Sequence, residues 1–198
     1  KQYVRVIDYK SSTRKMDLNK VVSGLQIQLI TYLDALTEAK DYEASGVLYL
    51  GLIDNIVKSV KNISEEEIEQ EIRKGFKMQG FVLADVKVIK TMDKNLENSN
   101  SSDIIPVTLT KDGDIMTSRS NILTKDEFKN LQKTVKRTIK EISTQILQGK
   151  IDIKPYNYEK NTGCDFCKYK AICNFNTNIK GNEYDYISKY GKVFMLKV

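Results

Sequence analysis

Hydrophobic and polar residues alternate at the start of the chain, which predicts a β-strand over residues 3–9 that the polar cluster 11–13 ends. Across 18–39 the apolar positions instead recur every three or four residues, and this spacing predicts one amphipathic helix. The apolar run 46–53 has the length of a buried strand lying next to the first. A strand, a helix and a second strand in this order predict a right-handed crossover connection.

The pattern in the middle of the chain predicts one more helix and two more strands. A capping box that begins at Ser64 predicts a helix over 64–74. Strands are predicted over 81–89 and 104–109. Between them, the Asn- and Ser-rich stretch near 93–103 predicts an exposed loop that could be disordered.

The longest predicted helix is amphipathic, spans 124–150 and begins at a second capping box. A basic stripe runs beside its apolar stripe. It consists of Lys129, Lys133, Lys136 and Lys140. A solvated helix face explains these lysines most simply, and contact with a DNA backbone is the alternative.

These elements together predict a single α/β domain over 1–198. Its expected parts are a strand–helix–strand core (1–60), an insert of helix and strand (61–123), the long helix (124–150) and a cysteine-rich C-terminal segment (151–198). Because the chain starts directly in a strand and without Met, we expect an N-terminally truncated piece of a larger protein.

Composition narrows the classes of function. Lysine and arginine total 32 against 26 acidic residues, and the net charge of +6 suits a polyanionic partner such as nucleic acid, although many basic proteins bind none. The sequence holds no apolar run of roughly 18 residues and does not open with a signal peptide, so we expect a cytoplasmic protein without a membrane partner. Because histidine is absent, Ser/His and Cys/His catalysis and His-ligated zinc are excluded.

The three cysteines, Cys164, Cys167 and Cys173, lie within ten residues of each other. An odd number of thiols in so short a segment is poor geometry for disulfides and favours a metal site. Zinc and a [4Fe–4S] cluster both take four ligands, and three thiols alone do not decide between them.

Asp8 and Lys10 are two residues apart on the first predicted strand, so their side chains should share one face. In phosphodiester hydrolysis a carboxylate can hold Mg²⁺, while a lysine orients the attacking water or neutralises developing negative charge. The plainer alternative, an ordinary ion pair at a strand end, is favoured for an isolated Asp-x-Lys motif.

The residues that follow change this balance. Gln28 and Tyr32 are one helical turn apart on the next helix, with Gln26 close by. The order VIDYKSS, then GLQIQLITY, then a short apolar strand resembles the RecB-type branch of the PD-(D/E)xK nucleases. This resemblance implies a restriction-endonuclease-like core, in which a mixed β-sheet is flanked by helices.

The resemblance also implies roles for individual residues. Asp8 would be a ligand of Mg²⁺, Tyr9 would offer its backbone carbonyl to the metal, and Lys10 would be the catalytic lysine. Gln28 and Tyr32 would line the site and help to position DNA, with Gln26 as a rival to Gln28.

Segments further along the chain resemble AddB-type nuclease domains. They are FKMQGFVLADVKVIKTMD, TKDGDIMTSRSNILTKDEF and ILQGKIDIKPY. AddB-like and Cas4-like nucleases join a downstream cysteine triplet to one upstream cysteine around a [4Fe–4S] cluster, and the long insert favours the AddB type. That upstream cysteine, a histidine and a first metal-binding aspartate are not in this sequence, so the piece is expected to be inactive alone.

The AddB resemblance implies a helicase–nuclease heterodimer with an AddA-like subunit. Such a complex processes double-strand DNA ends for recombinational repair, and this domain would cut the 5′-terminated strand. No nucleotide site is expected within this stretch. Two alternatives stay open, a non-catalytic DNA-binding module stabilised by metal and a Cas4-like exonuclease.

Overall fold

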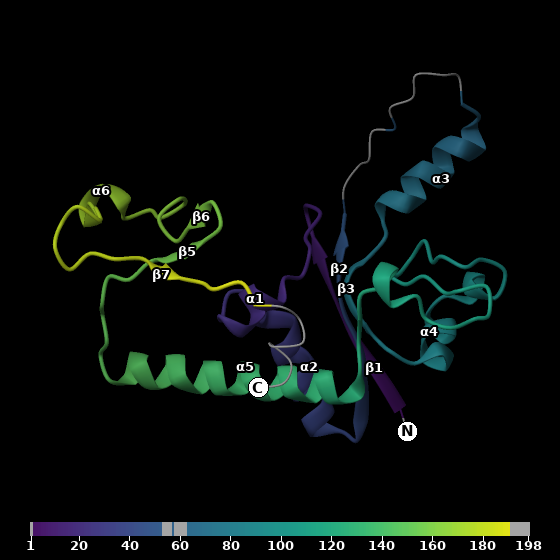
Figure 1. Cartoon of the computed structure of the whole chain (residues 1–198), viewed down its shortest axis with the longest axis horizontal. Coiled ribbons are helices and arrows are strands. Elements are labelled where there is room, and N and C mark those ends of the chain that lie inside the picture. Colours follow the sequence, from purple (N-terminus) through teal and green to yellow (C-terminus); the bar gives the residue numbers. More distant parts are fainter. Residues whose placement is uncertain (1, 53–56, 58–62, 191–198) are drawn as a thin grey trace.

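A four-stranded mixed sheet forms the centre of the computed structural model, which describes residues 2–52, 57 and 63–190. Its strands lie in the order β1 (Gln2–Lys10), β2 (Tyr42–Gly51), β3 (Gln79–Leu83) and β4 (Ile122–Leu123). The β1–β2 and β3–β4 pairs are parallel, whereas β2 and β3 are antiparallel. This mixed sheet with helices on both sides confirms the expected fold class (Figure 1).

Helices cover the two faces of the sheet with separate hydrophobic clusters. On one face lie α1 (Leu18–Val22), α2 (Gln28–Ala39) and α5 (Lys125–Leu147), and on the other lies α4 (Val86–Met92) (Figure 1). Leu29, Leu33 and Phe128 are buried in the first cluster. The second cluster packs α4 and the segment after it against β2 and β3. The two clusters together therefore pack against both faces of β1 and β2.

The remaining elements are short or lie outside this core. They are α3 (Glu65–Gly75), the 3₁₀ turns η1 (Lys94–Glu97) and η2 (Thr117–Arg119), β5 (Tyr156–Tyr158), β6 (Asn161–Thr162), α6 (Lys170–Cys173) and β7 (Asp185–Tyr186). The last three strands form a second sheet in the order β6-β5-β7. None of the helices among the described residues has the length and apolar character that crossing a membrane requires.

The single helix predicted over 18–39 is wrong, because the chain forms two helices with a break at Gly24. This glycine adopts φ +84°, a left-handed conformation that ends a helix. A Cβ there would also lie 3.3 Å from Ile142 and Thr138 of α5. The break is thus a point of close approach between two segments.

The predicted strand over 81–89 is correct only in its first part. β3 ends at Leu83, and Asp85 caps α4 by accepting hydrogen bonds from the N–H groups of Lys87 and Val88. A side-chain cap of this kind favours a helix where the apolar pattern alone indicated a strand.

The strand predicted over 104–109 is replaced by isolated bridges at Thr108 and Leu109. Ile105, Val107 and Leu109 are buried. The apolar pattern thus correctly predicted burial but not the backbone conformation. Pro106 has no N–H to donate to a sheet, which explains the irregular backbone. The short strand β4 completes the sheet instead.

The loop predicted to be exposed near 93–103 is exposed over most of its length and is anchored by a few buried residues. Asp93 and Ser102 are 3% and 0% exposed, and the Ser102 hydroxyl donates a hydrogen bond of 2.5 Å to Asp93 Oδ2. Leu96 of η1 is also buried. Most of its other residues are exposed, as predicted, and Leu96 anchors the loop to the second cluster.

The two predicted capping boxes are confirmed. Ser64 and Glu67 exchange hydrogen bonds at the start of α3, and Thr124 and Glu127 do the same at the start of α5. Strand β2 begins at Tyr42, earlier than predicted, and the last residue predicted for it, 53, lies outside the described residues.

Candidate active site

Asp8 and Lys10 lie on the face of β1 that packs toward α2. Val4 and Val6, which alternate with them along the strand, pack against the cluster that contains the buried side of α2. Asp8 Oδ2 lies 2.6 Å from Lys10 Nζ, and the two side chains are 21% and 23% exposed. The expected pairing of the acid and the amine on one strand face is therefore present.

One oxygen of this pair has unused bonding capacity. Asp8 Oδ2 is shielded from solvent and, apart from its 2.6 Å ion pair with Lys10 Nζ, accepts no hydrogen bond from the described residues. A buried carboxylate oxygen without a hydrogen bond is costly and is a good ligand for a hard divalent cation. Asp8 thus fits the role of one ligand for Mg²⁺, which usually keeps several waters.

Tyr49 lies opposite Asp8 in the parallel pairing of β1 and β2, and sequence reasoning missed it. Its side chain is 3% exposed, and Lys10 Nζ lies 5.6 Å from the centre of its ring. Burial raises the pKa of Tyr49, while the positive charges of Arg14 and then of Lys10 oppose that rise. The register of β1 and β2, which a single sequence does not reveal, is what brings it to the site.

Gln28 and Tyr32 lie on the exposed side of α2, which packs against both β1 and β2. The Gln28 side-chain amide donates a hydrogen bond of 3.1 Å to the Tyr32 hydroxyl. Tyr32 is 51% exposed. The predicted helical pair is therefore formed, with both polar groups accessible to a ligand that approaches this side of the helix.

Gln26 takes a different position, because it falls in the break between α1 and α2. Its Oε1 accepts a hydrogen bond of 2.9 Å from the N–H of Asp17, and its Nε2 donates one of 3.4 Å to the Lys15 carbonyl. The side chain thus binds the backbone of the loop that follows β1. Of the two rival glutamines, Gln28 is the one that contacts Tyr32.

The three cysteines line one cavity of about 230 Å³ in the C-terminal segment. Cys164 is half-buried, whereas Cys167 and Cys173 are exposed, and all three are free thiols. Across the described residues, no three Cys, Asp or Glu side chains converge closely enough to form a metal-binding group. The thiols are therefore near each other and of the right type, but they do not form a ligand set in this conformation.

Comparison with known proteins gives the chain a family. The sequence model of the PD-(D/E)XK nuclease superfamily matches residues 1–174, which include Asp8, Lys10 and all three cysteines. The chain belongs to this superfamily. The expected resemblance to the PD-(D/E)xK nucleases is thus confirmed.

Similar curated proteins are each named as one subunit of an ATP-dependent helicase/deoxyribonuclease. The relative from Clostridium botulinum (strain Loch Maree / Type A3) is 46% identical over 189 residues, and that from Clostridium kluyveri (strain NBRC 12016) is 44% identical. The relative from Caldanaerobacter subterraneus subsp. tengcongensis is 42% identical. Each alignment covers 92% of this chain and 16% of the relative, so the chain spans about a sixth of their length.

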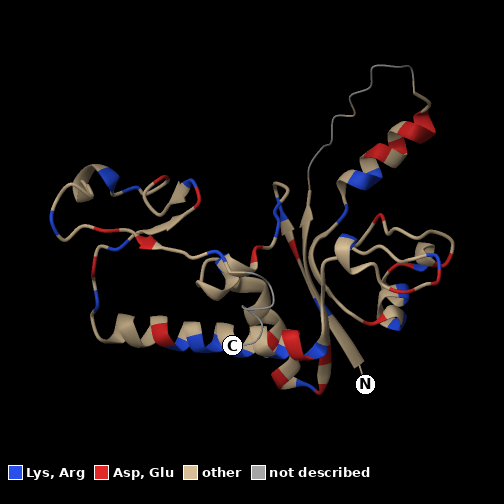
Figure 2. Cartoon of the chain, in the orientation of Figure 1, with Lys and Arg blue, Asp and Glu red and all other residues tan. Residues whose placement is uncertain are grey.

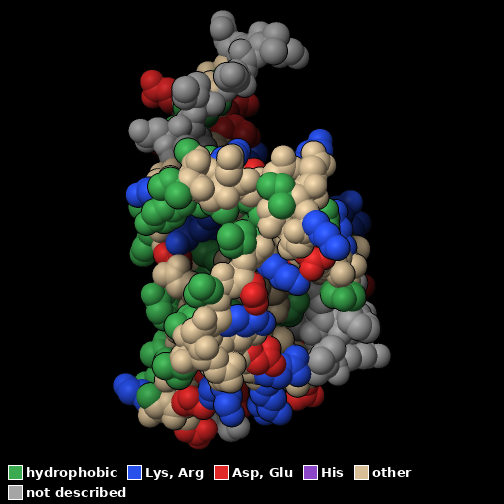
Figure 3. All heavy atoms as spheres, turned by 90° about the vertical axis from the view of Figure 1, so that its left-hand side faces the viewer, with side chains coloured by type: hydrophobic (Ala, Val, Ile, Leu, Met, Phe, Trp, Pro, Cys, Tyr) green, Lys and Arg blue, Asp and Glu red, His purple; other side chains and the backbone are tan. Residues whose placement is uncertain are grey.

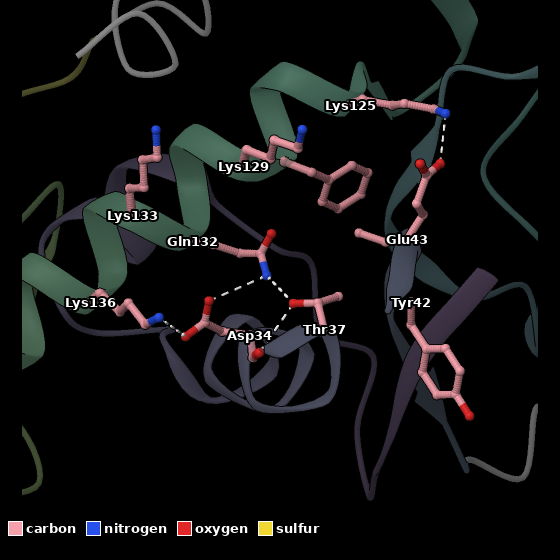
Figure 4. Close-up of a pocket in the computed structure, with 11 residues that line it drawn as sticks. Asp34, Thr37, Tyr42, Glu43, Lys125, Lys129, Gln132, Lys133 and Lys136 are labelled. Atoms are coloured by element: carbon pink, nitrogen blue, oxygen red, sulfur yellow. Dashed lines mark hydrogen bonds and ion pairs between the residues drawn. The ribbon is translucent and has the colours of Figure 1, made fainter. Parts of the chain in front are cut away.

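Basic residues recur along α5 (Figure 2), and the lysines of the stripe divide into those with and those without an ion pair to a described residue. Lys136 contacts Glu38 and lies 3.2 Å from Asp34, and the hydrogen bond to Glu38 raises the pKa of Lys136. Lys129 and Lys133 form no ion pair with any described residue and extend away from these contacts (Figure 4). The stripe is therefore partly an anchor between α5 and α2.

Behind the stripe, a cavity of about 310 Å³ lies between α2, α5 and the start of β2 (Figure 4). Gln132 crosses it and donates hydrogen bonds to Thr37 at 2.8 Å and to Asp34 at 3.4 Å. Lys125 closes one side through an ion pair of 2.6 Å with Glu43. The polar groups of this cavity are largely used in joining α5 to its neighbours.

Proposed function

We propose that this domain hydrolyses DNA phosphodiesters with the help of a divalent cation, Mg²⁺. The observation that carries the proposal is the Asp8–Lys10 pair at the end of β1, where a shielded carboxylate oxygen has no hydrogen bond and lies 2.6 Å from an ammonium. Membership of the nuclease superfamily supports the reaction class. The name of the relatives, which includes the word deoxyribonuclease, supports DNA as the substrate.

Each residue has a distinct role in this proposal. Mg²⁺, when bound, supplies a Lewis acid that polarises the phosphate and activates water. Asp8 offers a carboxylate oxygen to the cation, and Tyr9, whose own ring is exposed, offers its backbone carbonyl. Lys10 donates to the attacking water or to a phosphate oxygen, which neutralises charge that develops during the reaction.

Gln28 and Tyr32 are proposed to hold the DNA strand beside this pair. Their hydrogen bond fixes the orientation of both side chains, and their exposure leaves donors and a ring available to DNA. The unpaired lysines of α5, Lys129 and Lys133, with Lys140 further along, are proposed as weaker contacts to the DNA backbone.

Cys164, Cys167 and Cys173 are proposed to hold a [4Fe–4S] cluster together with a fourth ligand from outside this chain. Their shared cavity and free thiols support a metal site, and the rarity of clustered thiols outside such sites adds to this. The cluster would act as a structural tie for the C-terminal segment.

The whole protein is proposed to work in the cytoplasm with an AddA-like subunit on double-strand DNA ends. In this heterodimer the present domain would cut the 5′-terminated strand. The name of the relatives, which describes one subunit of an ATP-dependent helicase and deoxyribonuclease, supports a partner of this kind.

The test is strand-specific cleavage by the full-length protein with its partner, in Mg²⁺, with each DNA strand separately labelled. Asp8→Ala and Lys10→Ala should each abolish cutting of one DNA strand, while the other strand should still be cut. Asp112→Ala and Lys111→Ala, in an exposed turn, are the matched controls and should cut both strands. Normal cutting of both strands by Asp8→Ala would show that the domain is a binding module and not the nuclease.

A further inference from the structure

The segment that follows β1 turns back over the end of the sheet (Figure 1). The backbone atoms of Ser12 and Thr13 lie 3.5 Å from the position that a Cβ on Gly51 would occupy. Gly51 is paired with Lys10 in the β1–β2 register. The loop of residues 11–17 therefore lies against the strand ends that carry the Asp8–Lys10 pair.

Gln26 holds this loop just beyond Arg14. Its side-chain amide is bonded to the Lys15 carbonyl and to the N–H of Asp17, so both groups of the amide are used. Asp17 is held a second time, because its Oδ2 accepts a hydrogen bond of 2.7 Å from the Tyr158 hydroxyl. The loop is thus fixed on both sides of Arg14, at the strand end and at Asp17.

Arg14 carries an unpaired positive charge on this loop, near the end of β1. Its side chain is exposed and forms no ion pair within the part of the chain that the structure describes. Arg14 follows directly after Thr13, whose backbone N and Cα lie 3.5 Å from the Cβ position of Gly51, the strand partner of Lys10. Arg14 is therefore adjacent in the chain to the backbone that touches the strand end.

Apart from the proposed Mg²⁺, the two charges at the strand end largely cancel each other. Asp8 and Lys10 carry opposite charges at 2.6 Å, so the pair alone attracts a phosphate weakly. A guanidinium offers two parallel N–H donors that match two phosphate oxygens, and it stays charged at any working pH. Arg14 has this chemistry and no competing partner among the described residues.

We propose that Arg14 binds the scissile phosphate beside Lys10, on a loop that Gln26 holds in position. The proposal rests on the proposed nuclease function and adds to it a phosphate-binding residue and a positioning residue. Arg14 contacts two non-bridging oxygens, which aligns the phosphate with the water that Lys10 orients. Gln26 does not touch DNA and acts only through the loop.

The first experiment measures single-turnover cleavage by the full-length heterodimer at saturating DNA. Arg14→Gln should lower the rate constant by about 100-fold, the size of effect seen when one donor to a developing anion is removed. Arg14→Lys keeps the charge but loses the planar fork, so it should lose about 10-fold. Arg119→Gln, an exposed arginine in η2, is the matched control and should stay within about twofold of the unchanged protein.

The second experiment separates positioning from a general structural role. Gln26→Ala should slow cleavage by about 10-fold when Arg14 is present and have no effect when Arg14 is already glutamine, because Gln26 acts through Arg14. Independent, multiplying effects of the two substitutions would contradict the positioning role.

Asp8→Ala, measured in the same assay, distinguishes failure of the nuclease proposal from failure of the proposed role of Arg14. If Asp8→Ala abolishes cleavage and Arg14→Gln cuts at the normal rate, the nuclease proposal stands and the role of Arg14 is refuted. If Asp8→Ala cuts normally, the nuclease proposal itself fails and the role of Arg14 fails with it. A strong loss for both variants, with Arg119→Gln normal, supports both.

Discussion

The end of the central sheet and the cysteine-rich segment differ in what holds their functional side chains. Asp8 and Lys10 extend from a nine-residue strand between buried clusters, so packing places them before any ligand binds. The cysteines lie on turns and on the four-residue helix α6. Beyond residue 150, Tyr158 is the one buried hydrophobic side chain among the described residues.

The surface of the cysteine-rich end shows the same difference. Phe166, Ile172 and Ile151 are 96%, 85% and 90% exposed. Figure 3, which faces this end, shows hydrophobic side chains along one edge of it. Large exposed apolar groups indicate a segment without a core of its own. The comparison teaches that packing alone positions the Asp8–Lys10 pair, whereas the thiol segment has little packing of its own to order it.

The largest effect is expected from removing the thiols. Cys164→Ser should eliminate bound iron in anaerobically purified full-length protein and accelerate amide hydrogen exchange over 156–186 by at least about 100-fold, because metal binding and folding are coupled. Exchange in β2 should not change, since β2 belongs to the other region. Asn178→Ser, an exposed change in the same segment, should retain the iron. Colourless protein with stoichiometric zinc would contradict the iron–sulfur assignment.

An effect of comparable size is expected at Gly80, where β3 pairs with β2. This residue has φ +149°, and a Cβ on it would lie 2.1 Å from the Val47 carbonyl oxygen. Gly80→Ala should destabilise the sheet by about 4 kcal/mol, seen as faster hydrogen exchange in β2. Gly181, with φ +95° and no atom within 4 Å of its Cβ position, is the matched site in the cysteine-rich region. Gly181→Ala should cost only about 1 kcal/mol, and equal effects at both sites would break the comparison.

Tyr158 of the cysteine-rich region is hydrogen-bonded to Asp17, which belongs to the other region. Removing its hydroxyl should therefore lower stability by a moderate amount. Tyr158→Phe removes the hydrogen bond to Asp17 and should cost about 1 kcal/mol, measured as increased hydrogen exchange over 156–186. Tyr186→Phe, which alters an exposed hydroxyl in the same sheet, serves as the control. No difference between the two variants would mean that the regions are not joined here.

The same hydroxyl predicts a dependence on alkaline pH. Burial and then the hydrogen bond to Asp17 raise the pKa of Tyr158 to about 12. In the unfolded chain tyrosine titrates near pH 10, so its contribution to stability is complete below about pH 10 and is lost as the pH rises toward 12. The advantage of the unchanged protein over Tyr158→Phe should shrink across this window, and a constant difference would contradict the pKa shift.

The smallest effects are expected on α5. Lys136→Gln removes exposed ion pairs to α2 and should lower stability slightly, less than Tyr158→Phe does. Lys133→Gln, which removes an unpaired lysine, should leave stability unchanged and reduce the salt dependence of DNA binding by about one unit of slope. The reverse result, with Lys136 controlling DNA binding, would mean that its ion pairs open in the complex.

Sequence reasoning succeeded where the relevant geometry is local. The two-residue spacing of Asp8 and Lys10 sets one strand face, and the four-residue spacing of Gln28 and Tyr32 sets one helix side. It failed where distant segments decide. The segment 104–109 is buried without a strand, because its contacts are isolated bridges to Ser101 and Ile115.

Arg14 illustrates the same limit within the site. It lies in a loop whose path follows from Gln26, which is twelve residues later, and from a tyrosine of β5. No periodicity in the sequence encodes such contacts. Tyr49 likewise reaches the site through strand register, which depends on the pairing of whole strands.

The central claim is that Asp8 and Lys10 form a metal-dependent nuclease centre, and the Mg²⁺ dependence of cleavage by the full-length heterodimer tests it most directly. Asp8→Asn should raise the Mg²⁺ concentration for half-maximal cutting of the affected strand by at least about 10-fold, because a charged ligand is lost. Lys10→Met should lower the maximal rate and leave the Mg²⁺ requirement unchanged. Asp8→Asn with the normal rate and the normal Mg²⁺ dependence would contradict the account.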